Sequence, residues 1–384
     1  MIWYALLIPI LAVIVGWVLF KKEIVWWELF IPTAGSILFI LISYYSIKSY
    51  TLSDTEYNGF IVTEARYYEP YETWVKKTCS RTYSTGSGKT RTTHTVYYDC
   101  SYCDYNAEHY TIIDTKGNEI GISLSKYKSL MKQWRGKPKF VDLNRDIDYR
   151  GSCGKDGDMY FFAWDKEVHT SETTTYEKPF TNILKSNHSA FNYPEITEEE
   201  AKKASLYDYP KIANYNYQTS VLGLENTKIN NKWGFAKTLD HINGAYGSQY
   251  KVKVFTLFFK SKDINTAFLQ EAYWDGGNQN EIVVCIGVDK NGKFEWVKPF
   301  SWCDNKRVLI DIREELMSAK NPDSKLFHKT YYNAIRTHWK YKSFEDFNYL
   351  SFEPTSGQLI FVYLLTLIIS VATVWWCVTN NEKE

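Results

Sequence analysis

Three long apolar runs set the limits on how this chain can fold. Ile2–Phe20 and Leu359–Val378 carry no charged side chain, and Ile24–Ile47 carries only Glu28. A helix rises about 1.5 Å per residue, so the first run would cover roughly 29 Å, the thickness of a bilayer's hydrocarbon core. We therefore predict three transmembrane helices: a helical hairpin at residues 1–47 and a single helix at residues 358–379.

The charges beside these runs predict the orientation of the chain. The loop between the first two runs carries Lys21 and Lys22, and the C-terminal tail carries Lys383. Lys48, just after the second run, counts in the opposite direction. The positive-inside rule places the loop and the tail in the cytoplasm. We therefore predict an integral protein of the plasma (inner) membrane, in contact with membrane lipid, with an extracytoplasmic domain and a cytoplasmic C-terminus.

Composition shows that most of the chain is suited to water, and it excludes one class of function. The mean hydropathy is −0.37 and the formal net charge is +1. Nucleic-acid-binding proteins usually carry a clear basic excess, so we predict no nucleic-acid partner. About 310 residues separate the second and third runs, enough for one large domain or two ordinary ones.

The region between the membrane runs divides into a β-rich part and an α/β part. Residues 54–165 are rich in strand-forming residues and include a long hairpin with a Gly- and Ser-rich tip. Residues 166–225 are rich in Thr, Ser and Asn, so we predict a linker with one short helix, opened by the capping box Thr197–Glu200. Residues 226–345 alternate strand and helix patterns. The predicted fold class is therefore a membrane-anchored α+β protein.

The hairpin tip, Ser84-Thr85-Gly86-Ser87-Gly88-Lys89-Thr90, invites comparison with a P-loop. A P-loop requires glycine at the position of Tyr83 and a helix after the lysine. The residues that follow have a strand pattern instead. We therefore predict a hairpin tip and no nucleotide site.

Four cysteines lie in the β-rich part: Cys79, Cys100, Cys103 and Cys153. Cys100 and Cys103 have the spacing of a zinc knuckle, and the other two would complete a four-cysteine zinc site. The alternative is one or two disulfides, which an extracytoplasmic location permits. In that case a disulfide between Cys79 and either Cys100 or Cys103 would staple the long hairpin. We favour disulfides for an extracytoplasmic domain, with zinc as the alternative.

A polar break between a helix and a strand is the best candidate for a site in the second half. Asp275, Asn280 and Glu281 flank Gly276-Gly277, and Asp304 lies at the start of the predicted helix Arg307–Ala319. Loops at strand ends of α/β layers often bind ligands. Carboxylates and amides gathered there could hold a divalent cation and position a water for hydrolysis. The competing interpretation, a polar turn and a helix N-cap, is the favoured one.

The layout of residues 251–339 resembles the TPM-type domain. The similar features are the strand Val252–Phe259, the helix Ile264–Tyr273, the break Asp275–Asn280, a strand pair and a helix containing Tyr331-Tyr332. Members of that family are extracytoplasmic and tethered by a neighbouring membrane span. Some are acid phosphatases and others are assembly or repair factors. The chain as a whole resembles a bacterial or phage-borne membrane protein.

Two functional hypotheses follow. The first is a non-enzymatic, membrane-anchored interaction or assembly module that binds a protein partner or forms a homo-oligomer. The alternative is a TPM-like metal-dependent phosphatase that uses Asp275, Asn280, Glu281 and Asp304 outside the cytoplasm.

Overall fold

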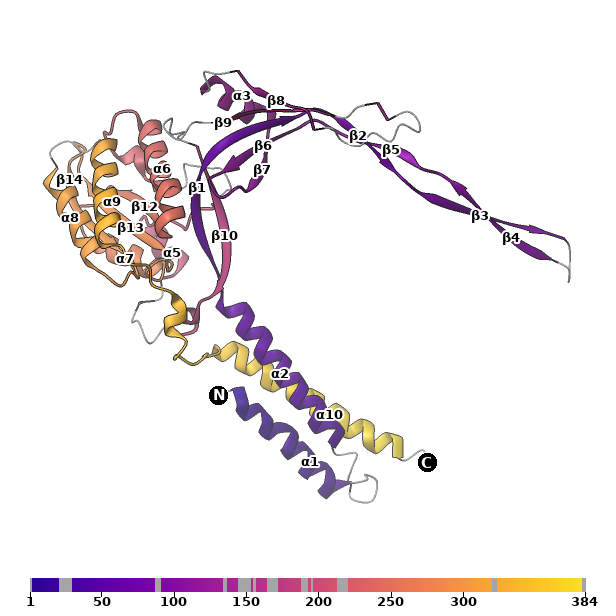
Figure 1. Cartoon of the computed structure of the whole chain (residues 1–384). Coiled ribbons are helices and arrows are strands. Elements are labelled where there is room, and N and C mark those ends of the chain that lie inside the picture. The colour runs from indigo at the N-terminus through magenta and orange to yellow at the C-terminus, as the bar shows by residue number, and fades with distance from the viewer. Residues whose placement is uncertain are drawn as a thin grey trace.

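The computed structural model describes residues 2–20, 30–86, 91–133, 137–143, 153–154, 157–163, 172–187, 193–194, 196–212, 220–319 and 323–381. Helices that begin and end the chain lie together at one end of the molecule (Figure 1). An α/β body adjoins them, and a long curved strand beside this body leads to a projecting two-stranded arm. The mixed α+β class predicted from the sequence is confirmed.

Three helices lie side by side at the apolar end (Figure 1). They are α1 (Leu7–Leu19, after a 3-10 turn at Ile2–Leu6), α2 (Phe30–Leu52) and α10 (Ser356–Asn381). Ile2 packs with Val362, and Phe20 packs with Val378, so α1 and α10 run in the same direction. The hydroxyl oxygens of Ser36 and Ser370 lie 2.9 Å apart between α2 and α10.

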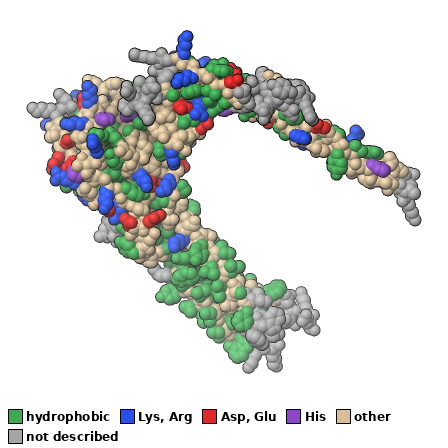
Figure 2. Space-filling view, viewed as in Figure 1, with side chains coloured by type: hydrophobic (Ala, Val, Ile, Leu, Met, Phe, Trp, Pro, Cys, Tyr) green, Lys and Arg blue, Asp and Glu red, His purple; other side chains and the backbone are tan. Residues whose placement is uncertain are grey.

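Two stretches are long and apolar enough to cross a membrane: Ile2–Leu19 and Ser356–Thr379. Hydrophobic side chains gather over this end of the molecule, whereas the body carries mixed charges (Figure 2). Within the described ranges, α2 does not meet the same measure of length and apolarity. Membrane crossing therefore stays a prediction for all three helices.

The β-rich part of the chain is built on β1 (Ser53–Tyr68), which follows α2 with no residue between them. The first half of β1 pairs antiparallel with β10 (Thr173–Thr181). The second half pairs with β6 on one edge and β9 on the other, in the order β7-β6-β1-β9-β8. The bounds are β6 (His109–Asp114), β7 (Glu119–Ile122), β8 (Lys139–Val141) and β9 (Met159–Ala163). Helix α3 (Leu124–Gln133) contributes Tyr127 and Leu130 to the core under this sheet.

The sequence interpretation of residues 166–225 needs one correction. We predicted a linker there, but residues 173–181 form strand β10 and Ile183–Ser186 form a 3-10 turn, η3. Threonine is β-branched and favours strands where a partner is available, and β1 supplies that partner. The short helix α5 (Glu198–Lys203) and its capping box at Thr197 are confirmed.

The arm is a ribbon of two antiparallel strands that leaves the far end of β1 (Figure 1). Strands β2 (Tyr71–Val75) and β5 (Tyr102–Asn106) form its near part, and β3 (Thr78–Thr85) and β4 (Thr92–Asp99) form its far part. The predicted hairpin is confirmed, with Gly86 at φ +96° at the start of its tip.

The body is a four-stranded sheet in the order β11-β12-β13-β14, parallel except for β14. The strands are β11 (Val221–Leu222), β12 (Lys253–Phe259), β13 (Glu281–Val288) and β14 (Phe294–Phe300). The helices are α6 (Lys232–Tyr250), α7 (Asn265–Tyr273), α8 (Arg307–Ser318) and α9 (Ser324–His338), with 3-10 turns η5 (Leu224–Asn226) and η6 (Phe344–Phe347). Both β12 and β13 are buried throughout, because one core lies against α6, α8 and α9 and a second lies on the α7 side.

Glycines allow β1 to approach α6 closely. A Cβ at Gly59 of β1 would lie 2.5 Å from the carbonyl oxygen of Asn243, and one at Gly247 would lie 2.7 Å from the backbone nitrogen of Gly59. Real Cβ atoms essentially never come under 3.0 Å of another heavy atom. The strand that carries the arm is therefore in backbone contact with the helical layer of the body.

We expect Gly59→Ala to lower the unfolding midpoint of the purified protein, because the added methyl group must push two backbones apart. Overpacking of this kind typically costs about 1–3 kcal/mol. The matched control is Gly121→Ala in β7, where a Cβ meets nothing within 4 Å. Equal midpoints for the two variants, measured by thermal unfolding in detergent, would contradict the close contact.

Candidate functional site

The polar break predicted from the sequence is a tight left-handed turn between α7 and β13. Asp275, Gly276 and Gly277 have φ values of +50°, +78° and +82° in succession. A Cβ at Gly276 would lie 2.8 Å from Nε1 of Trp302 and from the hydroxyl of Tyr193. Glycine is the residue that tolerates both the angle and the proximity.

The three amides after this turn, Asn278–Asn280, bind β1. Nδ2 of Asn278 donates to the carbonyl of Thr55 at 2.6 Å, and Nδ2 of Asn280 donates to the carbonyl of Tyr57 at 2.8 Å. Between them, Nε2 of Gln279 donates to the carboxylate of Glu56 at 2.5 Å. This amide loop holds β1 against the body over three successive residues.

A cavity of about 610 Å³ lies beside the amide loop. Its lining comes from the start of β1, from the residues around η3, from residues 208–209, and from the turn before β13. The charged residues on its wall are Asp54, Lys185, Asp208, Asp275 and Glu281. Nζ of Lys185 lies 3.2 Å from Oδ1 of Asp54 and donates to the carbonyl of Ser53 at 2.9 Å.

Glu281 is the most deeply placed carboxylate of this cavity. It is fully buried, accepts the hydroxyl hydrogen of Tyr209, and accepts a hydrogen bond from the backbone nitrogen of Asn278 at 2.9 Å. Burial raises its pKa to about 7, against the opposing effects of those hydrogen bonds and of Lys253. Burial also lowers the pKa of Lys253 and raises that of Asp240 to about 7.

The cavity unites only part of the predicted site. Asp275 and Glu281 line it, whereas Asn280 is occupied with β1. Asp304 forms ion pairs with Lys342 at 2.9 Å and Lys340 at 3.4 Å, and the hydrogen bond from Lys342 is the main cause of its lowered pKa.

The cavity also lies at the amino end of β13, since Glu281 is the first residue of that strand. Ligands of open α/β sheets gather outside the carboxyl ends, so the strand-end argument used on the sequence does not apply. Within the described residues, no three His, Cys, Asp or Glu side chains of this cavity place ligand atoms within 4.8 Å of one another. The three carboxylates of the proposed set, Asp275, Glu281 and Asp304, are thus not gathered around a common point.

The four cysteines of the β-rich part form two disulfides. Cys79 pairs with Cys100, with Cα atoms 5.8 Å apart, and Cys103 pairs with Cys153, with Cα atoms 5.7 Å apart. The first closes the far part of the arm, as the staple hypothesis expects, and the second ties the near part to the segment before β9. A four-cysteine zinc site needs four free thiolates, so the disulfide alternative is the one that this structure has.

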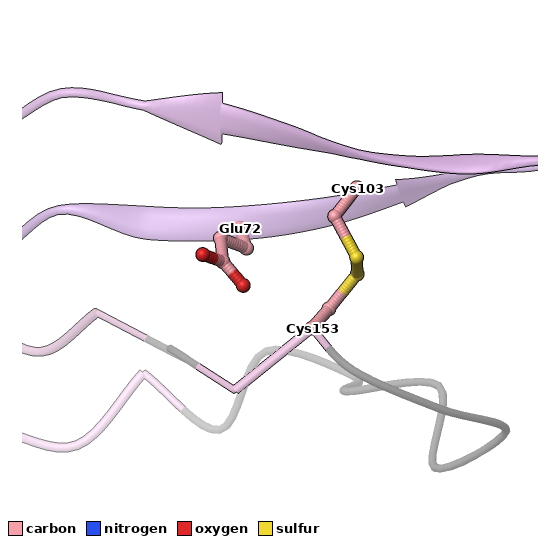
Figure 3. A group of neighbouring side chains, drawn as sticks. All are labelled: Glu72, Cys103 and Cys153. Atoms are coloured by element: carbon pink, nitrogen blue, oxygen red, sulfur yellow. A yellow bond between two sulfur atoms is a disulfide. The ribbon is translucent and has the colours of Figure 1, made fainter.

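Glu72 lies next to the second disulfide (Figure 3). Its ligand oxygen lies within 4.8 Å of the sulfurs of Cys103 and Cys153. Both sulfurs are bonded to each other, and Oε2 of Glu72 accepts a hydrogen bond from the backbone nitrogen of Gly154 at 3.0 Å. We therefore interpret Glu72, Cys103 and Cys153 as a structural link between the arm and the segment before β9, and not as a metal centre.

The far part of the arm offers a second candidate site, because its surface is unusually open. All residues of β4, and all of β3 except Cys79, are exposed. Pairing of Arg81 with Val96 and of Tyr83 with His94 places these four side chains on one face, together with Tyr98. The rings of Tyr83 and His94 stack with centroids 5.6 Å apart. We call these five residues the arm face.

The residues that complete the cavity could not be found by motif. Asp54 precedes the first predicted strand, and Asp208 and Tyr209 lie in the predicted linker. Their only sequence signal is the clustering of acidic and tyrosine residues in the segment 207–209 and at Asp54–Tyr57.

Comparisons with protein-family models, with curated proteins and with solved structures find no match to this chain.

The buried carboxylates predict how stability depends on pH. The folded pKa of Glu281 lies above its unfolded value, so the folded state binds this proton more tightly and loses stability as pH rises from about 4.5 to about 7. We expect the unfolding midpoint to fall less over this range in Glu281→Gln than in the parent protein, as measured by thermal unfolding.

The control is Glu314→Gln, which removes an exposed carboxylate of α8 outside the cavity. It should keep the parent slope. The same slope in Glu281→Gln and the parent would contradict the raised pKa.

Proposed function

We propose that this chain is a membrane-anchored, non-enzymatic interaction module whose arm contacts an extracytoplasmic partner. The observation that carries the proposal is the arm itself: a two-stranded ribbon, stapled by a disulfide, with almost every side chain exposed. An isolated two-stranded ribbon is marginally stable in water. A disulfide that stabilises such an element is best explained by binding at the surface of the arm.

Membrane anchoring is supported by the two apolar stretches and by the direct continuation of α2 into β1. We propose α2 as the third span, since it lies against α10 through the Ser36–Ser370 contact and runs opposite to it. The chain would then cross three times, with the body and arm outside and the C-terminus in the cytoplasm. The two disulfides support that orientation, because disulfides persist in oxidising compartments.

The charges of the arm indicate the chemistry of the partner. Among the described residues, Lys76, Lys77, Arg81 and Arg91 are exposed on or beside the arm strands, where the exposed acidic residues are Asp99 and Asp104. Aromatic residues and arginine are the side chains that most often dominate binding at protein interfaces. The arm, with Arg81 on the arm face and the other basic residues beside β3 and β4, therefore fits a protein surface of acidic character, on a different protein or on a second copy of this chain.

Photo-crosslinking from the arm face tests the proposal. A benzophenone amino acid at Tyr83 should form a discrete adduct in living cells, and Arg81→Glu should reduce its yield at least about fivefold by charge repulsion. The mass of the adduct, read by mass spectrometry, separates a homo-oligomer from a different protein.

The controls use the body. Ile310 on α8 has a similar exposure, 45% against 49% for Tyr83, and should give no discrete adduct. Arg313→Glu on the same helix is the matched charge reversal and should leave the Tyr83 yield unchanged. Absence of an adduct at Tyr83, or an equal one at Ile310, would refute the arm as the contact.

Thiol accessibility tests the orientation. A membrane-impermeant maleimide added to intact cells should label Cys79, Cys100, Cys103 and Cys153 only after reduction. Labelling that appears only after cell lysis would place the body and arm in the cytoplasm and overturn the proposed orientation.

The hydrolase alternative stays a prediction, and the charge of the cavity gives it little support. A phosphate ester is an anion, and the wall that holds Asp275 and Glu281 carries four carboxylates and one lysine. Such a balance repels anionic substrates unless cations neutralise it.

A further inference from the structure

The two strands of the far part of the arm each have an open edge. Strands β3 and β4 pair only with each other in the part of the chain that the structure describes. An edge strand presents backbone N–H and C=O groups of alternate residues outward, and another strand can pair with them. The pairing of β3 with β4 runs from Thr78–Asp99 to Thr85–Thr92 without a shift in register. No bulge therefore interrupts either edge.

The edge of β4 lacks the features that protect edge strands elsewhere in this molecule. Proteins block pairing at an edge with short strands, charged side chains or proline. At the ends of the two larger sheets, β7, β8 and β11 are four, three and two residues long, and β14 carries Lys298 and Pro299. Strand β4 has eight exposed residues, and residues 92–98 include no proline, lysine, arginine, aspartate or glutamate. This edge is therefore open to another strand.

The sequence of β4 is complementary to itself in one antiparallel register. When Thr95 lies opposite Thr95 of a second copy, every other pair of residues 92–98 brings an aromatic ring opposite a β-branched side chain. These pairs are Thr92 with Tyr98, Thr93 with Tyr97, and His94 with Val96. Aromatic and β-branched residues that lie directly opposite each other stabilise a sheet. Strand β4 is therefore suited to pair with its own copy.

The same register also brings opposite charges together at both ends of the joint. Arg91, the residue before β4, lies opposite Asp99 of the second copy, and two-fold symmetry repeats the pair. Both side chains are exposed. Asp99 accepts hydrogen bonds from Ser101 at Oδ1, and these neutral donors leave its negative charge in place. Because opposite charges favour one alignment of two strands over others, the two pairs select this register.

We propose that β4 pairs antiparallel with β4 of a second copy of this chain, around a two-fold axis at Thr95. The inference rests on the proposed function, in which the arm makes the contact, and it specifies the partner and the edge. Two ribbons then form one sheet in the order β3-β4-β4-β3. Sheets of three or more strands can be stable where an isolated two-stranded ribbon is marginal.

The geometry of the arm is compatible with this joint. The arm projects from the body, so antiparallel pairing places the two bodies at opposite ends of the four-stranded sheet (Figure 1). Residues that lie directly opposite each other in antiparallel strands have their side chains on the same face of the sheet. His94 and Val96 both belong to the arm face, and each lies opposite the other. The arm faces of the two copies therefore join into one continuous surface.

Charge substitutions at the two-fold axis test the proposal in the full-length protein. Two differently tagged copies are co-expressed, one with a benzophenone amino acid at Tyr97, which is 72% exposed. We expect a chain–chain adduct whose linked peptide, mapped by mass spectrometry, contains Thr93 of the second copy. Thr95→Lys in both copies should lower the yield at least about fivefold, because two lysines then lie opposite each other, and Thr95→Glu in both should act alike. One copy of each variant should restore the yield to within about twofold of the parent.

Thr82→Lys in both copies is the matched control. Thr82 pairs with Thr95 within the ribbon, and their hydroxyl oxygens lie 3.2 Å apart, so this variant loses the same contact and gains the same charge. The two Thr82 positions would be three strand spacings apart, roughly 14 Å, where salt screens their repulsion. The yield should therefore stay close to that of the parent.

Three results would overturn the proposal: no chain–chain adduct from Tyr97, an equal loss in Thr82→Lys and Thr95→Lys, or no recovery when the lysine and glutamate variants are combined. A Tyr83 adduct with a different protein, without a chain–chain adduct at Tyr97, would overturn this inference and leave the proposed function standing. Absence of any adduct at both positions would overturn both.

Discussion

The contact between β1 and the body is the interaction on which the rest of the structure depends. Glycines bring the backbone of β1 onto α6, and the amide loop Asn278–Asn280 binds three successive residues of the same strand. The acceptors are two main-chain carbonyls and the buried carboxylate of Glu56. A buried carboxylate without partners would be costly, and Glu56 also accepts hydrogen bonds from the Tyr341 hydroxyl at 3.0 Å and from Nδ2 of Asn58 at 2.6 Å. Shape and hydrogen bonding therefore fix one register of strand against body.

Buried charges reinforce this joint further along the molecule. Glu172, just before β10, forms ion pairs with Lys237 of α6 at 3.1 Å and with Lys126 of α3 at 2.6 Å. Burial acts to raise the pKa of Glu172, but the two lysines outweigh it and the pKa is lowered. Stability from this group is thus present above the unfolded pKa and is lost as pH falls through the lower folded value. One carboxylate links the sheet of β1, its covering helix and the body.

Much of the fold could be predicted from local pattern, whereas the contacts between distant segments could not. Strands β12 and β13 are mostly apolar along their length, and the arm follows from strand formers around a glycine-rich tip. Strand β10 was missed because its threonine-rich sequence has no clear periodicity. Its pairing with β1, which makes it a strand, cannot be seen in the local sequence.

The same limit applies to the site. The sequence from Asp275 to Glu281 predicts polar side chains at a turn, and the structure has a tight turn there. No pattern says that Asn280 will bind Tyr57, more than two hundred residues earlier in the chain, or that Asp304 will face lysines instead of Glu281. These pairings depend on how the segments pack, and packing is decided by many side chains at once.

The direct junction of α2 with β1 determines how the arm is held. Leu52, the last residue of the helix, is buried with Ile183, Phe344 and other residues of the cluster at the base of the body. The backbone nitrogen of Asn182 donates to the carbonyl of Leu52 at 2.7 Å, so the junction is also hydrogen-bonded. Flexible linkers of glycine and serine let a domain sample many positions, and no such linker separates this helix from this strand. The strand β1 is thus joined directly to α2 by packed secondary structure, and only residues 69–70 separate it from β2, the first strand of the arm.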